Sequence, residues 1–246
     1  MGIQGCSDFC QECGACGVRG ASTVPSSREA LVNTIVEAVL RDLRGNGAAA
    51  AEERELTIPL GVSNRHIHLR EESFKTLFGA QAAPEVYRNL YQPGEHALVQ
   101  TCILVGPKMR PIHDVRILGP FRSYDQVEVS FTDAMRLGID PPIKDSGDLR
   151  GAAPITIVGP AGSLVLREGA IIANRHVHMA LTDAARFGVR QGDFIKVKLP
   201  GAKGSIYERV LVRTNESWKL QLHLDTDDAN AAHVVCNQTA FFAGKE

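Results

Sequence analysis

The stretch SNRHIHL at residues 63–69 returns as ANRHVHM at residues 173–179. Side chains two positions apart on a β-strand point to the same face, so each copy predicts two imidazoles side by side. The two pairs are His66 with His68, and His176 with His178. Paired neutral imidazoles are suitable ligands for zinc, iron, cobalt or nickel. One such pair is commonly just solvent-facing histidine, but its return in the same Asn-Arg-His context favours two metal sites.

The chain from about Leu56 onward is rich in short apolar or alternating runs, which glycine and proline separate at short intervals. Examples are ALVQTCILVGP at 97–107, HDVRILGP at 113–120 and ERVLVRT at 208–214. Many short strands with frequent turn signals predict a barrel or a sandwich. Short helices interrupt the strands, at REESFKTLFG, FTDAMRLGI and LTDAARFGV.

Several of these pieces repeat within the chain. Each NRHxH copy leads into a short helix that ends at a glycine, Gly79 or Gly188. FTDAMRLGI echoes LTDAARFGV, and ILVGP at 103–107 echoes TIVGP at 156–160. The pieces do not follow one simple register, which favours two related barrel units with partly exchanged strands over a tandem array.

An amphipathic helix is predicted before this region, over residues 26–44. Its apolar side chains recur at helical spacing and form one stripe, made of Leu31, Val32, Ile35, Val36, Val39, Leu40 and Leu43. Ser26 and Glu29 form a capping box, and Gly45 supplies the stop. The segment GNGAAAAEERE that follows reads as a linker, so residues 26–55 form a tethered helix whose apolar face needs a partner.

Residues 1–25 form a Cys/Gly-rich arm without apolar periodicity. Its four cysteines have the spacing C-x3-C-x2-C-x2-C and are Cys6, Cys10, Cys13 and Cys16. They could bind zinc or an iron–sulfur cluster, or they could be incidental thiols on a flexible tail. Cys102 and Cys236 are expected at buried strand or tail positions.

Bulk composition excludes several classes of function. The formal net charge of −1 gives no electrostatic case for binding nucleic acid or an anionic membrane. No apolar run reaches the length of a membrane span, and the first residues lack the features of a signal peptide. We therefore expect a cytoplasmic protein, without nucleic acid or membrane partners. No P-loop and no GxGxxG after a strand is present.

Three further residues are weak candidates when judged on the residues alone. His223 alternates with three leucines, and Glu128 alternates with Val127 and Val129, so both face away from the apolar side chains. The default is a surface or core position for His223 and a solvated strand face for Glu128. Arg122 lies in a turn, and its guanidinium suits phosphate. Arg65 and Arg175 are expected to brace the repeated motif through hydrogen bonds to backbone or carboxylate. His96, His113 and His233 follow no pattern and are expected to be structural.

In these motifs the chain resembles the PduL-type phosphate acyltransferases, also called phosphotransacylases. The resemblance covers roughly Leu56 to Ala232 and includes PLGVSNRHIHL, VRILGPFRSYDQVEVSFTDAMRLGI, IVGPAGSLVLREGAIIANRHVHM and LHLDTDDANAA. It implies a mainly β fold with short α-helices and two barrel units. One unit spans residues 66–173, and the other joins residues 56–65 to residues 174–246.

The resemblance also implies roles for single residues. His66 and His68 match one ligand pair, which Glu128 completes; His176, His178 and His223 match the second ligand set. Two zinc ions are therefore expected, and Arg122 occupies the position of a phosphate-contacting arginine. The implied reaction converts propanoyl-CoA or acetyl-CoA and phosphate to acyl phosphate and CoA, reversibly, without a covalent acyl-enzyme. The metal at His66, His68 and Glu128 would polarise the thioester or bind the departing sulfur, and the second metal would hold phosphate together with Arg122.

The predicted helix with its linker resembles the encapsulation peptides that direct such enzymes into bacterial microcompartments. Shell or cargo proteins are thus expected partners, and so is a second copy of the chain, because the helix could instead serve oligomerisation. Two alternatives remain at this stage: a metal-dependent hydrolase, in which water replaces phosphate, and a non-catalytic scaffold of the shell.

Overall fold

The structure, a computed structural model, describes residues 32–40 and 55–246. The chain separates into two units, residues 1–54 and 55–246. In the first unit, residues 32–40 are helical, within the predicted helix. The capping box, the linker and the four clustered cysteines lie outside the described residues. Among the helices that the structure describes, none has the length and apolar character needed to cross a membrane.

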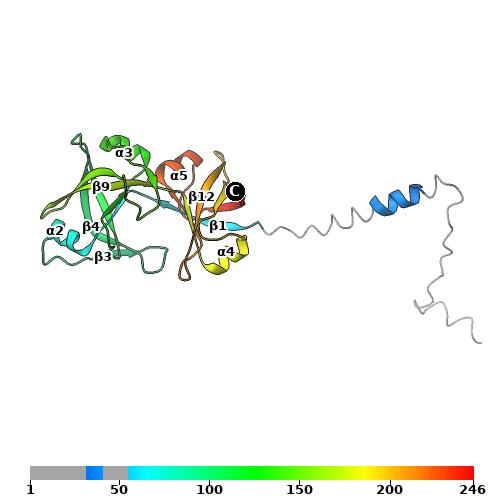
Figure 1. The fold of residues 1–246 in the computed structure, drawn as a ribbon, viewed down its shortest axis with the longest axis horizontal. Coiled ribbons are helices and arrows are strands. Elements are labelled where there is room, and N and C mark those ends of the chain that lie inside the picture. The colour runs from blue at the N-terminus through cyan, green and yellow to red at the C-terminus, as the bar shows by residue number, and fades with distance from the viewer. Residues whose placement is uncertain (1–31, 41–54) are drawn as a thin grey trace, which may run out of the picture. The chain divides into compact units, whose positions relative to one another are not determined.

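One barrel of the second unit, here the terminal barrel, is built from the two ends of residues 55–246 (Figure 1). Its six strands form a closed circle: β1 (Thr57–Ser63), β13 (Gln221–Asp225), β10 (His176–Met179), β12 (Ser205–Thr214), β11 (Phe194–Leu199) and β14 (Thr239–Lys245). The circle closes where β14 pairs antiparallel with β1.

The other barrel, here the central barrel, is built from the middle of the unit. Its strands, in order around the barrel, are β4 (His96–Val105), β5 (Pro111–Gly119), β2 (His66–His68), β6 (Gln126–Glu128), β9 (Ser163–Ala173) and β8 (Ala153–Val158). The pairing of β8 with both β9 and β4 closes the barrel. The short strands β3 (Val86–Asn89) and β7 (Ile143–Lys144) pair with β4 and β9 outside this circle.

The chain crosses between the barrels at each copy of the NRHxH motif. β1 belongs to the terminal barrel and continues through Asn64 and Arg65 into β2 of the central barrel. β9 belongs to the central barrel and continues through Asn174 and Arg175 into β10 of the terminal barrel. The prediction of a mainly β chain with two related barrels and partly exchanged strands is confirmed.

Each barrel has its own apolar core, and strand alternation explains why. In β13, Leu222 and Leu224 are buried, so His223 between them faces the opposite side, as predicted. Val127 and Val129 are buried around Glu128 in the same way. Glu128 is nevertheless only 8% exposed, so the default expectation of a solvated strand face is wrong.

Four short helices follow the ligand-bearing strands. α2 (Glu71–Phe78) follows β2 and α4 (Leu181–Phe187) follows β10; they end at Gly79 and Gly188, as predicted. α3 (Phe131–Leu137) follows β6, and α5 (Thr226–Ala232) follows β13. The positions of α2 and α4 are therefore equivalent, as are those of α3 and α5. The echo of FTDAMRLGI in LTDAARFGV links α3 with α4, which occupy different places in the repeat.

Candidate functional site

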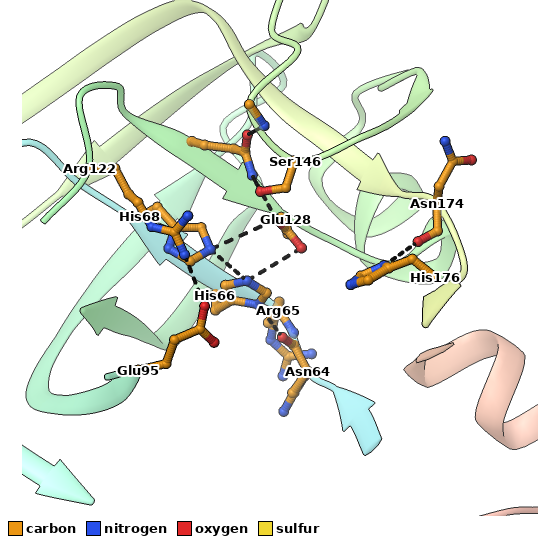
Figure 2. A network of polar contacts seen from close by, with 12 residues as sticks. Asn64, Arg65, His66, His68, Glu95, Arg122, Glu128, Ser146, Asn174 and His176 are labelled. Carbon is orange, nitrogen blue, oxygen red and sulfur yellow. Dashed lines mark hydrogen bonds and ion pairs between the residues drawn. The ribbon is translucent and has the colours of Figure 1, made fainter. Parts of the chain in front are cut away.

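The first candidate site, here the central site, consists of His66, His68 and Glu128 (Figure 2). β2 and β6 pair antiparallel, with His66 opposite Glu128, so strand register alone brings the three side chains together. The Nε2 atoms of His66 and His68 lie 3.2 Å apart. One carboxylate oxygen of Glu128 lies 3.4 Å from His66 Nε2, and the other lies 3.8 Å from His68 Nε2. The three side chains thus converge on one place.

The second candidate site, here the terminal site, repeats this arrangement in the other barrel. β10 and β13 pair antiparallel, with His176 opposite His223. His223 therefore takes the place that Glu128 has in the central site, and His178 completes the group. In each site, the ligand atoms all lie within 4.8 Å of one another.

A backbone carbonyl fixes the tautomer of the first histidine in each motif. The Nδ1 atoms of His66 and His176 lie 2.8 Å from the carbonyl oxygens of Asn64 and Asn174. Because a carbonyl only accepts, Nδ1 carries the proton and Nε2 keeps its lone pair for the site. A carbonyl partner of this kind is the usual support of a metal-bound imidazole.

The donor atoms fit a cation better than they fit the protein around them. Nε2 of His178 and Nε2 of His223 are buried and have no hydrogen-bond partner among the described residues. A buried polar atom without a partner is costly, so an arrangement of this kind calls for a ligand. Three nitrogens, or two nitrogens and one carboxylate oxygen, form donor sets that suit zinc with one position left open.

Burial keeps the imidazoles in the neutral form that a metal requires. It lowers the pKa of His178 to about 2 and that of His68 to about 3. Burial also lowers the pKa of His176 and His223. For Glu128, burial alone would raise the pKa, but the nearby histidines hold it below its ordinary value, so the central site carries a carboxylate.

The arginine of each motif braces the helix behind the third donor. Arg65 donates to Asp133 of α3 at 2.9 Å. Arg175 forms two hydrogen bonds to Asp228 of α5, at 2.7 and 2.8 Å, and its guanidinium lies over the Tyr207 ring. The bracing expected from the sequence is therefore present in both repeats.

Both sites open on one cleft of about 760 Å³ between the barrels. All six donor residues line it, and so does Arg122. The Arg122 side chain forms an ion pair with Glu95 at 3.2 Å, and its buried Nε has no hydrogen-bond partner among the described residues. Arg122 can therefore offer part of its guanidinium to an anion in the cleft.

The cleft also contains residues that the sequence did not reveal. Arg88, Arg116 and Arg213 add positive charge to its wall, and Trp218 stacks on His178 with 4.0 Å between ring centroids. His113 and Cys236 line it too; Cys236 is exposed, whereas Cys102 is buried. These residues come from segments that are far apart in the sequence, and only the three-dimensional pairing of the strands brings them together.

Comparison with known proteins gives consistent matches. A family model described as phosphate propanoyltransferase matches residues 59–235. A phosphate propanoyltransferase of Thermotoga maritima is 48% identical over 180 residues, which cover 73% of this chain and 85% of that protein. One from Salmonella typhimurium is 46% identical over 182 residues, covering 74% and 86%. One from Lachnoclostridium phytofermentans is 45% identical over 181 residues, covering 74% and 84%.

Proposed function

The chain belongs to the phosphate propanoyltransferase family and is a phosphate acyltransferase, and we propose that it acts with metal ions bound at the central and terminal sites. Two buried donor sets of three residues, open to one cleft, are the observation that carries this proposal. The overall reaction joins acyl-CoA and phosphate to give acyl phosphate and CoA, and it is reversible.

His66, His68 and Glu128 would hold one cation, and His176, His178 and His223 the other. Bound there, a divalent cation such as zinc would act as a Lewis acid toward the thioester carbonyl or the departing thiolate. The chain itself supplies neutral imidazoles of fixed tautomer in the NRHxH motifs and one carboxylate, Glu128.

The chain must also hold two anionic reactants in contact, and the positively charged side chains of the cleft can offset their charge. Arg122 would bind phosphate with its free donor atoms while Glu95 keeps the guanidinium in place. Arg88, Arg116 and Arg213 would attract the phosphates of CoA. A phosphate oxygen then forms the new bond to the carbonyl carbon, and the sulfur leaves with the electron pair of the broken bond. Positioning of this kind can account for much of a rate enhancement.

Propanoyl-CoA is the acyl donor we propose, in line with the names of the matched relatives. Acetyl-CoA is the alternative donor, because one methylene changes discrimination by only about 10–200-fold.

The decisive experiment follows acyl phosphate and free CoA with both acyl-CoA substrates, with and without phosphate. The same reactions are repeated after the metal has been removed by a chelator and after zinc has been restored. We expect acyl phosphate only with phosphate present, loss of turnover on chelation, and recovery with zinc. Release of CoA at an equal rate without phosphate would indicate a hydrolase, and full activity of the chelated protein would refute the metal dependence.

The N-terminal helix suits a second role, docking on shell or cargo proteins inside a bacterial microcompartment. Val32, Ile35, Val36 and Val39 are each between 47% and 52% exposed in the helix over residues 32–40. So short a helix is marginal alone in water, and its apolar face suits recognition in a groove.

Deletion of residues 1–45 tests this role against self-association. We expect the specific activity to stay largely intact, while co-localisation with shell proteins in cells is lost. A truncated protein that still enters the compartment would refute targeting. A change in oligomeric state alone would indicate that the helix joins copies of the chain.

A further inference from the structure

Gln126 is a fully buried polar side chain beside the central site, and none of the roles above uses it. Its exposed fraction is 0%. It lies on β6 two residues before Glu128, so both side chains point to the same face of the strand. On the partner strand β2, Gln126 stands opposite His68.

Three hydrogen bonds fix the Gln126 side chain. Its Oε1 accepts from the Gly147 backbone N–H at 2.8 Å. Its Nε2 donates to Glu128 Oε1 at 2.7 Å and to Ser146 Oγ at 2.9 Å. A backbone N–H can only donate, so the amide oxygen must face Gly147 and the amide NH₂ must face Glu128.

The central site needs such a support more than the terminal site does. The imidazole of His66 has its free nitrogen fixed by the bond from Nδ1 to a carbonyl. A carboxylate can rotate and present either oxygen, or both, to a cation. The hydrogen bond from Gln126 to Oε1 of Glu128 fixes the rotation of the carboxylate, with Oε2 3.4 Å from His66 Nε2 and Oε1 3.8 Å from His68 Nε2.

We propose that Gln126, held by the Ser146–Gly147 loop, is a positioning residue that fixes the orientation of the Glu128 carboxylate for metal binding. It orients the carboxylate and leaves its charge in place, because the amide is a neutral donor. This inference rests on the proposed metal dependence. The loop following β7 thereby becomes part of the support of the central site, although it supplies no ligand.

The test measures zinc affinity of each site separately, by competition with a chelator. The central site is measured in a His178→Ala background, and the terminal site in a His68→Ala background. Gln126→Leu keeps most of the side-chain volume and removes all three hydrogen bonds. We expect a loss of about 10–100-fold in affinity at the central site, the usual effect of removing a support of a ligand. Affinity at the terminal site should not change.

A matched control comes from the same barrel. Gln100 accepts from the Glu85 N–H and donates to the Ala83 carbonyl, at 3.1 and 3.0 Å, and it does not line the cleft. Gln100→Leu should leave both zinc affinities unchanged. Ser146→Ala removes one hydrogen bond of the network, and it should weaken the central site by a smaller factor.

The possible results are distinct. An unchanged central affinity in Gln126→Leu, or an equal loss at both sites, would overturn the inference. If Gln126→Leu does not fold, an unchanged central affinity in Ser146→Ala would overturn it. If the unmutated chain binds no zinc at either site, the proposed metal dependence is overturned together with the role of Gln126. If the unmutated chain binds zinc and Gln126→Leu has no effect, only the role of Gln126 is overturned.

Discussion

The central and terminal sites begin with the same NRHxH motif and differ in the third donor. Register places Glu128 opposite His66 in one barrel and His223 opposite His176 in the other. With the same cation bound, the central site would be one unit less positive than the terminal site, because only its third donor carries a charge. The repeated scaffold thus fixes where the donors lie, and one residue on the partner strand decides the electrostatics of each site.

The largest expected effect is a loss of turnover when one ligand is removed from either site. His66→Ala and His176→Ala should each lower turnover by about 10³-fold, since loss of a Lewis acid costs several kcal/mol of transition-state stabilisation. Bound zinc should fall in both variants, while the fold is retained.

The control for this pair is His233→Asn, at the exposed C-cap of α5, where φ is 55° and asparagine is well tolerated. Full activity in either ligand variant would contradict the two-site proposal. A small loss in one variant beside a large loss in the other would show that the two sites contribute unequally to the reaction.

The next largest effect is expected on stability, and it should differ between the two arginines that brace the motifs, Arg65 and Arg175. Asp133 is more deeply buried than Asp228, with 8% against 20% of its side chain exposed. Arg65→Ala therefore leaves the more desolvated of the two carboxylates without its partner. We expect a loss of about 2–3 kcal/mol in the free energy of unfolding for Arg65→Ala and of about 1–2 kcal/mol for Arg175→Ala.

Denaturant unfolding measures both losses. The double variant Arg65→Ala, Asp133→Asn should recover part of the stability, because no charge is then left without a partner. A larger loss for Arg175→Ala would show that its second hydrogen bond and its contact with Tyr207 outweigh burial.

Arg122→Lys tests whether phosphate is held beside the central site. Lysine keeps the charge and loses the planar fork, so the KM for phosphate should rise about tenfold, which corresponds to about 1.4 kcal/mol. The KM for acyl-CoA should change less. Arg186→Lys, which alters an ion-paired arginine on α4 outside the cleft, is the control. An unaltered response to phosphate would exclude Arg122 as the anion contact.

The smallest expected effect is a loss of stability of the metal-free protein as the pH falls. The pKa of His178 in the folded chain is about 2, below its ordinary value of 6.5, so below pH 6.5 the unfolded chain binds a proton that the folded chain does not. Stability contributed by neutral His178 is complete above that pH and is lost as pH falls. Between pH 7.5 and 5.5 the loss is about 1 kcal/mol for each such histidine. His178→Gln should reduce the loss by that amount, and an identical pH dependence would contradict it.

Sequence patterns were informative where a residue acts through its immediate neighbours. The spacing in NRHxH placed two imidazoles on one face, and alternation placed His223 and Glu128 away from the leucine and valine core. Patterns did not reveal how strands from distant segments pair, and so Arg213, Trp218 and Arg116 were missed. The similarity of FTDAMRLGI and LTDAARFGV was misleading, because it reflects shared helix-forming residues and not equivalent positions. Gln126 could have been found, since it stands two residues before Glu128 on a strand.

The exchange of strands also has a consequence for how the chain is made. β1 is synthesised before any other strand of residues 55–246, yet its partners are β13 and β14, at residues 221–225 and 239–245. The central barrel has all of its strands once residue 173 has been made, so it can close on the ribosome while β1 is still without a partner. A ribosome that stalls before β13 would therefore release a chain with one finished barrel and an exposed strand, a species prone to pair with other unfinished chains.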